Sequence, residues 1–431
     1  NFNFNLSKIN KKEIKFLPSQ MRHKKTQVEN YFTGNNLKKT KNCKIIGSLD
    51  FGGLSNYWGL QIDNYINLNN QKLKKKTQKD INSSFLELLR NYKLLGTFKS
   101  KDTTYSNDYL IPAHLEEFKK QKNKKFNLQK PILAFNKLLK KKNLNNLNED
   151  KDKLNSYNFL KKSRLSKKIR FHNFYLDEMT SLGKKIKLTC KNKNKYKVFV
   201  ANKVILATGT IATTKLVMGF LNIKREVKIN HHPRLIAVYL GKKNIKFNLN
   251  FTPSLLQFIG KGKENYFCAD FRPGNKLITE SMVELSKLLY PLKFLINFFK
   301  NRLIFTNILL SPKYSDIYIK NLNKSFLIYT KKNNLLSKLK KANFKIFSFL
   351  NKKKIIYPFF KTHFPGVGSD FHYFGTLPMN SKSKLSVNEK CQLKDHNNIY
   401  IVDSSVFNFK ENKYPLGIVM ANARRVGKLI S

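Results

Sequence analysis

The C-terminal part of the chain contains the pattern that most restricts its fold. A histidine precedes a Gly-Thr pair in His372-Tyr-Phe-Gly-Thr376, and the apolar run Ile399-Tyr-Ile-Val402 is followed directly by Asp403. Farther on, Tyr414-Pro-Leu-Gly417 introduces an apolar stretch with helical spacing. Proline is favoured at the start of a helix, and alternation or a short apolar run indicates a strand. The pattern therefore predicts a site assembled from three separated segments.

A second informative segment is Val204-Ile-Leu-Ala-Thr-Gly-Thr210. It predicts a short buried strand that runs into a Thr-Gly turn and then a helix over Ile211–Phe220. Upstream, Lys185–Cys190 and Tyr196–Val200 alternate across a polar turn and predict a β-hairpin. A buried strand that ends in Thr-Gly before a helix is typical of nucleotide-binding α/β folds, although many such turns serve packing alone.

The third segment is Gly52-Gly-Leu-Ser-Asn-Tyr-Trp-Gly59. The adjacent Gly52 and Gly53 lack Cβ atoms, so their backbone can approach a planar or phosphorylated ligand closely. Ser55 and Asn56 can hydrogen-bond the edge of such a ligand. Taken alone, an ordinary tight turn explains this run equally simply.

The charge of the chain is unusual. Among its 431 residues, 84 Lys and Arg face 26 Asp and Glu, for a formal net charge of +58. A nucleic-acid or anionic-membrane partner is one interpretation. The other is compositional drift, since the lysines are spread along nearly the whole sequence and no nucleic-acid motif accompanies them. We therefore do not expect a nucleic-acid partner.

The cysteines and the apolar runs bear on location. The four cysteines lie far apart without a C-x-x-C pair, which predicts neither a metal site nor a disulfide framework and suits a reducing cytoplasm. No run of eighteen or more uncharged apolar residues occurs, so we expect no spanning helix. The prediction is a cytoplasmic protein, with peripheral membrane contact as an alternative.

Amphipathic helices are predicted in several places. Residues 282–310 combine leucines at helical spacing with lysines, and a second basic stretch follows at Leu335–Phe349. Such helices can cover a core, line a substrate channel or lie in a membrane surface. Shorter helical patterns occur at Phe85–Leu95 and Pro131–Leu139, and the Lys- and Asn-rich run Lys140–Asn148 is interpreted as a solvated loop.

In this order and spacing, the segments resemble the glucose-methanol-choline (GMC) family of FAD-dependent oxidoreductases. The glycine-pair segment looks most like that of the pyranose oxidase-like, sugar-oxidising branch, and His231-His-Pro233 is similar to the Asp-His-Pro that begins the family's substrate domain. The resemblance implies that His372 is the catalytic base and that Tyr414 stands at the second catalytic position. It also implies a set of FAD-binding residues: Gly52, Gly53, Ser55, Asn56, Ala207, Thr208, Gly209, Asp403, Ser404, Pro415 and Leu416.

Three departures from the family pattern matter. Tyr414 occupies a position that usually holds Asn or His, and with an ordinary pKa of about 10 it is a poor proton acceptor at neutral pH. Tyr57 stands where some members carry a histidine that binds flavin covalently, so non-covalent FAD is expected. No G-x-G-x-x-G occurs, although that fingerprint holds the dinucleotide pyrophosphate. We expect that an N-terminal element is missing from this sequence.

The resemblance implies a mixed α/β fold with a discontinuous antiparallel-sheet substrate domain. Its expected parts are an incomplete Rossmann-like FAD-binding domain over 1–230, the substrate domain with its basic helices over 231–365, and a return to the FAD domain over 366–431. The implied function is oxidation of a CH-OH group, in a sugar or polyol, by hydride transfer to FAD. A degenerate, non-catalytic relative and a basic peripheral membrane-binding protein are the alternatives. The sequence specifies neither the electron acceptor nor the oligomeric state.

Overall fold

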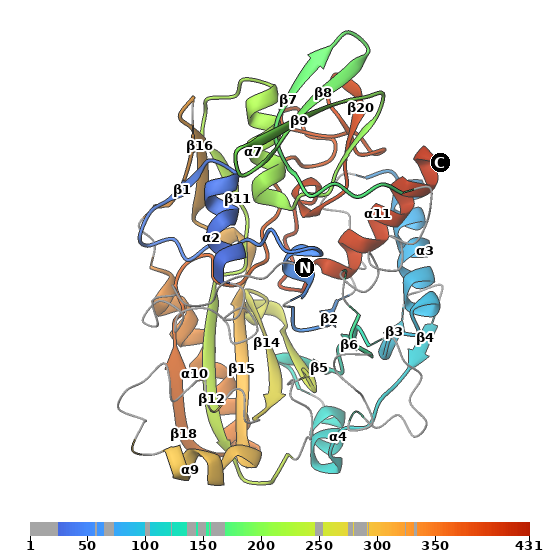
Figure 1. The fold of residues 1–431 in the computed structure, drawn as a ribbon. Coiled ribbons are helices and arrows are strands. Elements are labelled where there is room, and N and C mark those ends of the chain that lie inside the picture. Colours follow the sequence, from blue (N-terminus) through green and yellow to red (C-terminus); the bar gives the residue numbers. More distant parts are fainter. Residues whose placement is uncertain are drawn as a thin grey trace.

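The computed structural model describes residues 25–431 apart from 57, 64–72, 100–103, 122, 136–143, 145–151, 155, 157–168, 246–252, 275–278, 280–290, 292, 324 and 332–333. Within this part of the chain, helices and both parallel and antiparallel strands pack around one continuous hydrophobic core (Figure 1). The predicted mixed α/β class is therefore confirmed.

The largest sheet has six strands, all of them antiparallel to their neighbours. It fills the lower half of Figure 1. Its order is β18 (Ile356–His363), β12 (Arg234–Gly241), β15 (Leu303–Leu310), β14 (Phe267–Pro273), β13 (Leu256–Gly260) and β5 (Phe126–Gln129). Every residue of β14 is buried, whereas β12 alternates between buried and half-buried positions. The centre of this sheet is thus covered on both faces.

Helix α10 (Leu335–Lys352) packs against β12, β15 and β18. Its buried face includes Leu339, Ile346 and Leu350, which recur at helical spacing. The side chain of Asn343 on the same face accepts a hydrogen bond of 2.7 Å from the Tyr239 hydroxyl. The amphipathic pattern therefore places this helix on the sheet, because its apolar stripe and the sheet bury one another.

A pair of parallel strands lies at the other end of the molecule. β10 (Val204–Leu206) pairs in parallel with β20 (His396–Ile401), which in turn pairs with the short β19 (Gln392–Leu393). Helix α7 (Thr210–Phe220) begins directly after β10 and is buried along most of its length. The carboxyl ends of parallel strands meet at one edge of a sheet, so the residues after β10 and β20 lie close together.

The remaining elements join distant parts of the sequence. β1 (Leu37–Lys39), which follows helix α2 (Lys25–Gly34), completes a sheet of order β1, β17 (Phe326–Thr330), β16 (Ile317–Asn321) and β11 (Val227–Ile229). A three-stranded antiparallel sheet consists of β7 (Tyr175–Leu182), β8 (Lys185–Asn192) and β9 (Lys195–Ala201). Two short pairs are β2 (Gln61–Ile62) with β6 (Ile132–Leu133) and β3 (Gly96–Lys99) with β4 (Thr104–Asn107). The other helices are α3 (Lys75–Asn91), α4 (Ala113–Lys120), α9 (Lys293–Phe298) and α11 (Leu416–Ile430).

Helices α3 and α11 pack side by side. Between them, Glu87 accepts hydrogen bonds of 2.7 Å from Arg424 and Lys428.

Most local predictions are confirmed. The hairpin over residues 185–201, the strand and helix around Gly209, and the helix beginning at Leu335 are all present. Two helix predictions are wrong where the chain is described. Residues 303–310 form β15, because nearly continuous burial suits a central strand. Residues 132–133 form β6, and the rest of the predicted basic helix before Lys293 falls largely outside the described residues, as does the loop of residues 140–148.

The predicted domain boundaries remain predictions. The six-stranded sheet consists mainly of strands from the predicted substrate domain, and β5 adds a strand from the earlier part of the chain. None of the helices in the described ranges is long and apolar enough to cross a membrane.

Candidate active site

Asp403 closes the turn beyond the paired parallel strands. Its buried carboxylate accepts hydrogen bonds from the Ser405 backbone N–H at 3.0 Å and the Ser405 hydroxyl at 2.6 Å. The Thr213 hydroxyl on α7 donates a third. Burial raises the pKa of Asp403, and these bonds act in the opposite direction by stabilising the charged form. The side chain of Asp403 therefore fixes the end of β20 against the first turn of α7.

The same turn is bound to the segment that carries His372. The hydroxyls of Thr210 and Ser404 both donate to the carbonyl oxygen of Tyr373, at 2.5 and 2.7 Å. Deeper in the core, Thr214 donates to the Thr376 hydroxyl at 2.6 Å. The His-x-x-Gly-Thr segment is thus held by α7 and the Asp403 turn.

His372 and Tyr414 meet at the centre of the site. Their rings are nearly perpendicular, at 82°, and their centroids are 5.0 Å apart. Tyr414 is positioned through its backbone, because its N–H donates to Asp63 at 2.7 Å and the next residue, Pro415, is the N-cap of α11. The two residues predicted to be catalytic are therefore neighbours.

A buried ion pair lies under Tyr414. The Tyr414 hydroxyl donates to Asp270 at 2.9 Å, and Arg272 forms a bidentate contact with the same carboxylate oxygen at 2.6 and 2.7 Å. The Asn307 N–H donates to the other oxygen at 2.7 Å. Burial, together with the charge of Asp270, raises the pKa of Tyr414 well above its ordinary value. Tyr414 is therefore a hydrogen-bond donor and remains protonated at neutral pH.

Asp63 supports the site from the N-terminal side. It follows β2, is almost completely buried, and accepts hydrogen bonds from Tyr414 N–H and from the Gln257 amide at 2.8 Å. Burial raises the pKa of Asp63, and the Tyr414 bond counters this rise. β2, which follows the glycine-pair segment, and β13 of the six-stranded sheet, which carries Gln257, therefore meet at Asp63 beneath Tyr414.

Asp370 holds the histidines. One of its oxygens contacts His231 Nδ1 at 2.8 Å, and the other accepts from the His232 N–H at 2.9 Å and the His372 N–H at 3.3 Å. Burial by itself would raise the pKa of Asp370, but the charge and hydrogen bond of His231 lower it to about 2. The carboxylate thus remains charged and fixes the backbone on both sides of the site.

The imidazole of His372 is neutral at physiological pH. Burial lowers its pKa to about 3, although the charge of Asp370 acts in the opposite direction. Burial also lowers the pKa of His232, whose ring centroid is 5.7 Å from that of His372, to about 4. A neutral imidazole has a free lone pair, so His372 can accept a proton from a reacting group.

Four buried nitrogen atoms of this cluster have no hydrogen-bond partner among the described residues: His372 Nδ1, His231 Nε2, His232 Nε2 and Arg234 Nε. Arg234 begins β12, and its guanidinium carbon lies 5.5 Å from the centroid of the Phe371 ring. Buried polar atoms are normally satisfied in folded proteins, so their concentration around one histidine is typical of a ligand site.

The predicted cofactor residues fall into two groups. Ala207, Thr208 and Gly209 lie exposed just before α7, next to Asp403 and Ser404, while Pro415 precedes α11 and Leu416 begins it. The glycine-pair segment forms a turn in which Ser55 donates to the Gly52 carbonyl at 2.6 Å and Asn56 to the Phe51 carbonyl at 3.0 Å. No hydrogen bond between described residues joins Gly52, Gly53, Ser55 or Asn56 to His372 or Asp403. Tyr57 lies outside the described residues.

Sequence reasoning missed most of the residues that surround His372 and Tyr414. The segment Phe267-Cys-Ala-Asp-Phe-Arg-Pro273 contains the signal for two of them. Asp270 and Arg272 are two residues apart in an apolar strand, which places them on the same face, and a buried pair of opposite charges is expected there. Asp370 and Arg234 carry no comparable signal, because only the fold brings them together.

Comparisons with known proteins add little to this geometry. No family model matches the chain, and no curated protein matches it significantly. Among solved structures, pyridoxine 4-oxidase from Mesorbium loti aligns with a TM-score of 0.44 and 12% identity over 70% of this chain. The aligned part covers 64% of that oxidase. A similarity this low assigns neither a family nor an activity.

Proposed function

We propose that this protein is a flavin-dependent oxidoreductase that oxidises a CH-OH group of a sugar or polyol. The observation that carries the proposal is the contact between His372 and Tyr414 inside a buried cluster of charged groups. The resemblance of the sequence motifs implies that both residues stand at the catalytic positions of one site, and their ring centroids lie 5.0 Å apart.

The described residues fit a flavin at the start of α7. A side chain at Gly209 would meet no atom within 4 Å, and Gly209 has a φ of +81°, so its backbone is open to close approach. The N–H groups of the first helical turn carry a partial positive charge that favours an anionic or electron-rich ligand. Gly53, with a φ of +59°, is equally open. Asp403 would act by shaping this turn, because its oxygens already bind Ser405 and Thr213.

A bound flavin would supply the acceptor for the hydride of the substrate C–H bond. In the proposed mechanism His372 accepts the proton of the substrate hydroxyl, since its imidazole is neutral and half-buried. Asp370 orients His372 by accepting the hydrogen bond from its backbone N–H. It also provides a negative charge that favours the imidazolium formed by proton transfer.

Tyr414 and the arginines have different tasks in this proposal. The hydroxyl proton of Tyr414 is directed to Asp270, so its oxygen is available to accept a hydrogen bond from the substrate and orient it. The positive charge that stabilises a developing alkoxide comes from Arg234, whose Nε is buried without a partner among the described residues. Arg272 holds the Asp270 carboxylate in place beneath them.

The test begins with the purified protein and added FAD. Binding should change the visible flavin absorption and quench flavin fluorescence, and anaerobic addition of alcohols and sugars should bleach the oxidised band for at least one of them. Bleaching without any added alcohol, or no bleaching with a broad panel of them, contradicts the proposed reaction.

A second candidate function is favoured by the way Tyr414 is bound. Its hydroxyl donates to Asp270 and its pKa is raised well above the ordinary value, so it cannot replace a second proton acceptor. This would suit a relative that binds a ligand without catalysis. If the protein binds FAD but no alcohol reduces the bound flavin, this candidate is favoured. Reduction of the bound flavin by a substrate would exclude it.

A further inference from the structure

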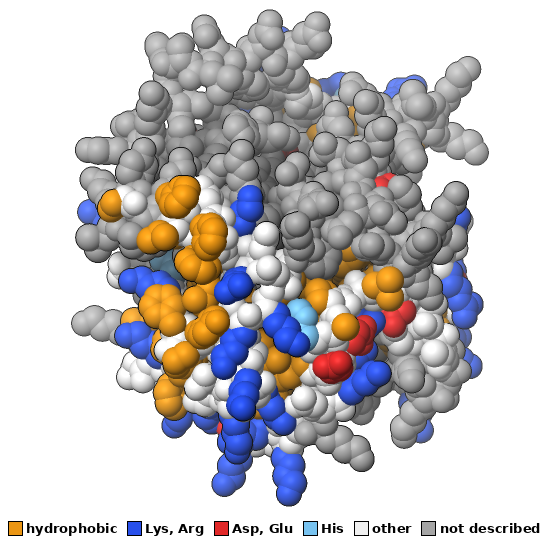
Figure 2. All heavy atoms as spheres, turned by 90° about the horizontal axis from the view of Figure 1, so that it is seen from below, with side chains coloured by type: hydrophobic (Ala, Val, Ile, Leu, Met, Phe, Trp, Pro, Cys, Tyr) orange, Lys and Arg blue, Asp and Glu red, His pale blue; other side chains and the backbone are white. Residues whose placement is uncertain are grey.

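The lower end of the molecule exposes large apolar side chains. On helix α9, 79% of Phe294, 49% of Leu295 and 72% of Phe298 are accessible to solvent. In the view from below, hydrophobic side chains gather in one region that is flanked by Lys and Arg (Figure 2). Large contiguous apolar patches on the surface of a folded protein usually mark sites that bind a protein, a membrane or a ligand.

Strand β18 extends this surface. Tyr357 is 39% exposed and Phe359 is 63% exposed. Ile356 at the start of β18 pairs with Gly241 at the end of β12. The end of β12 lies beside the start of β15, and β15 follows α9 in the sequence. The start of β18 therefore lies at the same end of the molecule as α9. We call Phe294, Leu295, Phe298, Tyr357 and Phe359 the apolar patch.

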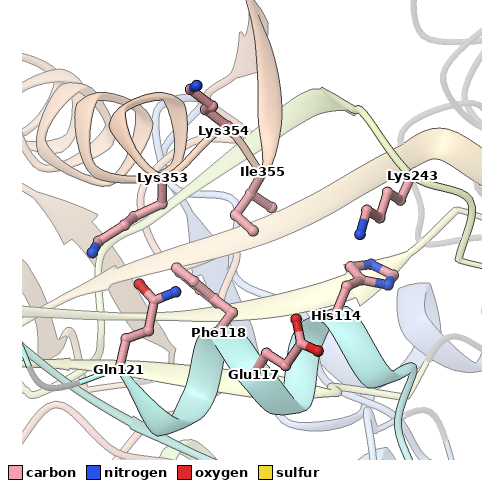
Figure 3. A pocket seen from close by; sticks show the side chains of 8 residues that line it. All are labelled: His114, Glu117, Phe118, Gln121, Lys243, Lys353, Lys354 and Ile355. Carbon is pink, nitrogen blue, oxygen red and sulfur yellow. The ribbon is translucent and has the colours of Figure 1, made fainter.

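A basic pocket adjoins the apolar patch. It encloses 290 Å³ between α4 and the turn from α10 to β18, and Lys243, Lys353, Lys354 and His114 line it (Figure 3). In Figure 3, Lys243 extends toward His114, and Lys353 and Lys354 project from the turn that faces helix α4. Glu117 also lines the pocket and contributes a carboxylate to it. Within the described ranges, none of the three lysines forms an ion pair with a carboxylate.

The pocket and the β18 part of the apolar patch lie on the same backbone segments, at the end of β12 and the start of β18. The Lys242 N–H donates to the Ile355 carbonyl at 2.9 Å, and the Lys242 ammonium lies 5.7 Å from the centroid of the Tyr357 ring. Lysines therefore stand directly beside the exposed aromatic side chains. Cations at the level of lipid head groups, next to apolar side chains that enter the acyl boundary, are the arrangement of proteins that lie on a membrane.

We propose that this end of the protein docks on the surface of an anionic phospholipid bilayer. Phe294, Leu295 and Phe298 enter the boundary between head groups and acyl chains, and the pocket lysines bind lipid phosphates. The formal charge of +58 adds long-range attraction to such a surface. A nucleic-acid partner accounts for the lysines alone, whereas a bilayer also accounts for the exposed apolar side chains of α9. The proposal does not depend on the proposed oxidoreductase activity.

The test is co-sedimentation with vesicles of phosphatidylcholine, with and without about 30% phosphatidylserine, at low and at physiological salt. Wild-type protein should bind the anionic vesicles and lose affinity as salt rises. Phe294→Ser with Phe298→Ser should weaken binding about tenfold or more, and so should Lys243→Gln with Lys353→Gln and Lys354→Gln. All five positions are exposed, and an unchanged thermal midpoint checks that the fold is retained.

The three-stranded sheet at the opposite end of the molecule offers matched controls. Leu182→Ser with Val198→Ser removes two side chains that are 53% and 51% exposed, and Lys184→Gln with Lys187→Gln and Lys195→Gln removes three exposed charges. These variants should bind vesicles as the wild type does. Equal losses in test and control variants would show a diffuse charge effect and overturn the proposal. So would binding to a DNA duplex that depends on Phe294 and Phe298, or absence of vesicle binding at low salt.

Discussion

The ring of His372 stands nearly perpendicular to that of Tyr414, with 5.0 Å between their centroids. The backbone on either side of this contact is fixed by buried carboxylates, since Asp370 binds the His372 N–H and Asp63 binds the Tyr414 N–H. Such support restricts how far the two rings can separate. The pair is therefore positioned before any ligand binds, which lowers the cost of orienting a substrate.

Replacing Tyr414 with Phe tests how much its hydroxyl contributes. The variant loses the hydrogen bond to the Asp270 carboxylate, which should lower the free energy of unfolding by about 2 kcal/mol. We expect FAD affinity to stay unchanged and the rate of substrate-driven flavin reduction to fall about tenfold or more. Tyr239→Phe is the matched control, because it removes a buried hydroxyl bonded to Asn343 beneath α10. Equal reduction rates in the two variants would exclude a role for Tyr414 beyond packing.

Gly209→Ala tests the proposed flavin position. Gly209 has φ 81° and ψ 150°, a backbone conformation that is nearly restricted to glycine, and its open side faces no other atom. The added methyl group should lower FAD affinity about tenfold, as measured by fluorescence titration. Gly183→Ala, at a φ of +56° in the β7–β8 turn, strains the backbone far from the site and should bind FAD normally. Unchanged affinity in Gly209→Ala would remove this turn from the binding site.

The Asp270–Arg272 pair should show strong energetic coupling. Asp270→Asn leaves the buried Arg272 charge uncompensated by its carboxylate, and we expect a loss of about 3–5 kcal/mol in urea unfolding. The double variant Asp270→Asn with Arg272→Gln should lose less than the sum of the two single losses. Additive losses would show that the two side chains act independently.

The stability of the protein should depend on pH through His372. Burial lowers its pKa from 6.5 to about 3, so between these values the unfolded chain binds a proton that the folded chain does not. The contribution of His372 to the free energy of unfolding is therefore complete above pH 6.5 and is lost as the pH falls toward 3. From pH 7 to pH 5, wild type should lose about 2 kcal/mol more than His372→Gln in urea unfolding. Parallel pH profiles would contradict a neutral His372 imidazole in the folded protein.

The sequence predicts the parts of this structure that local periodicity determines. The hairpin at residues 185–201, the strand and helix around Gly209 and the amphipathic helix at Leu335 all follow from apolar spacing. The apolar spacing of residues 303–310 predicts a helix, but these residues form a strand, because a continuous apolar run fits a buried strand and a helix equally well.

The candidate site was only partly predictable for a related reason. The motifs predict His372 and Tyr414 as site residues. His372 lies on a loop that is hydrogen-bonded to α7, and Tyr414 directly precedes the N-cap of α11. The groups that set their electrostatics come from distant strands: Asp270 lies on β14, Arg234 begins β12 and Asp63 follows β2. Their convergence depends on the packing of the sheets, which no local pattern encodes.

The most direct test of the central claim is anaerobic, substrate-driven flavin reduction in His372→Ala. FAD should bind with its visible spectrum unchanged, while an alcohol that reduces the wild type should leave the variant oxidised, with at least about a hundredfold slower reduction. His172→Ala, at an exposed histidine before β7, should behave as the wild type does. Reduction of the His372→Ala flavin at the wild-type rate would contradict the assignment of His372 as the base.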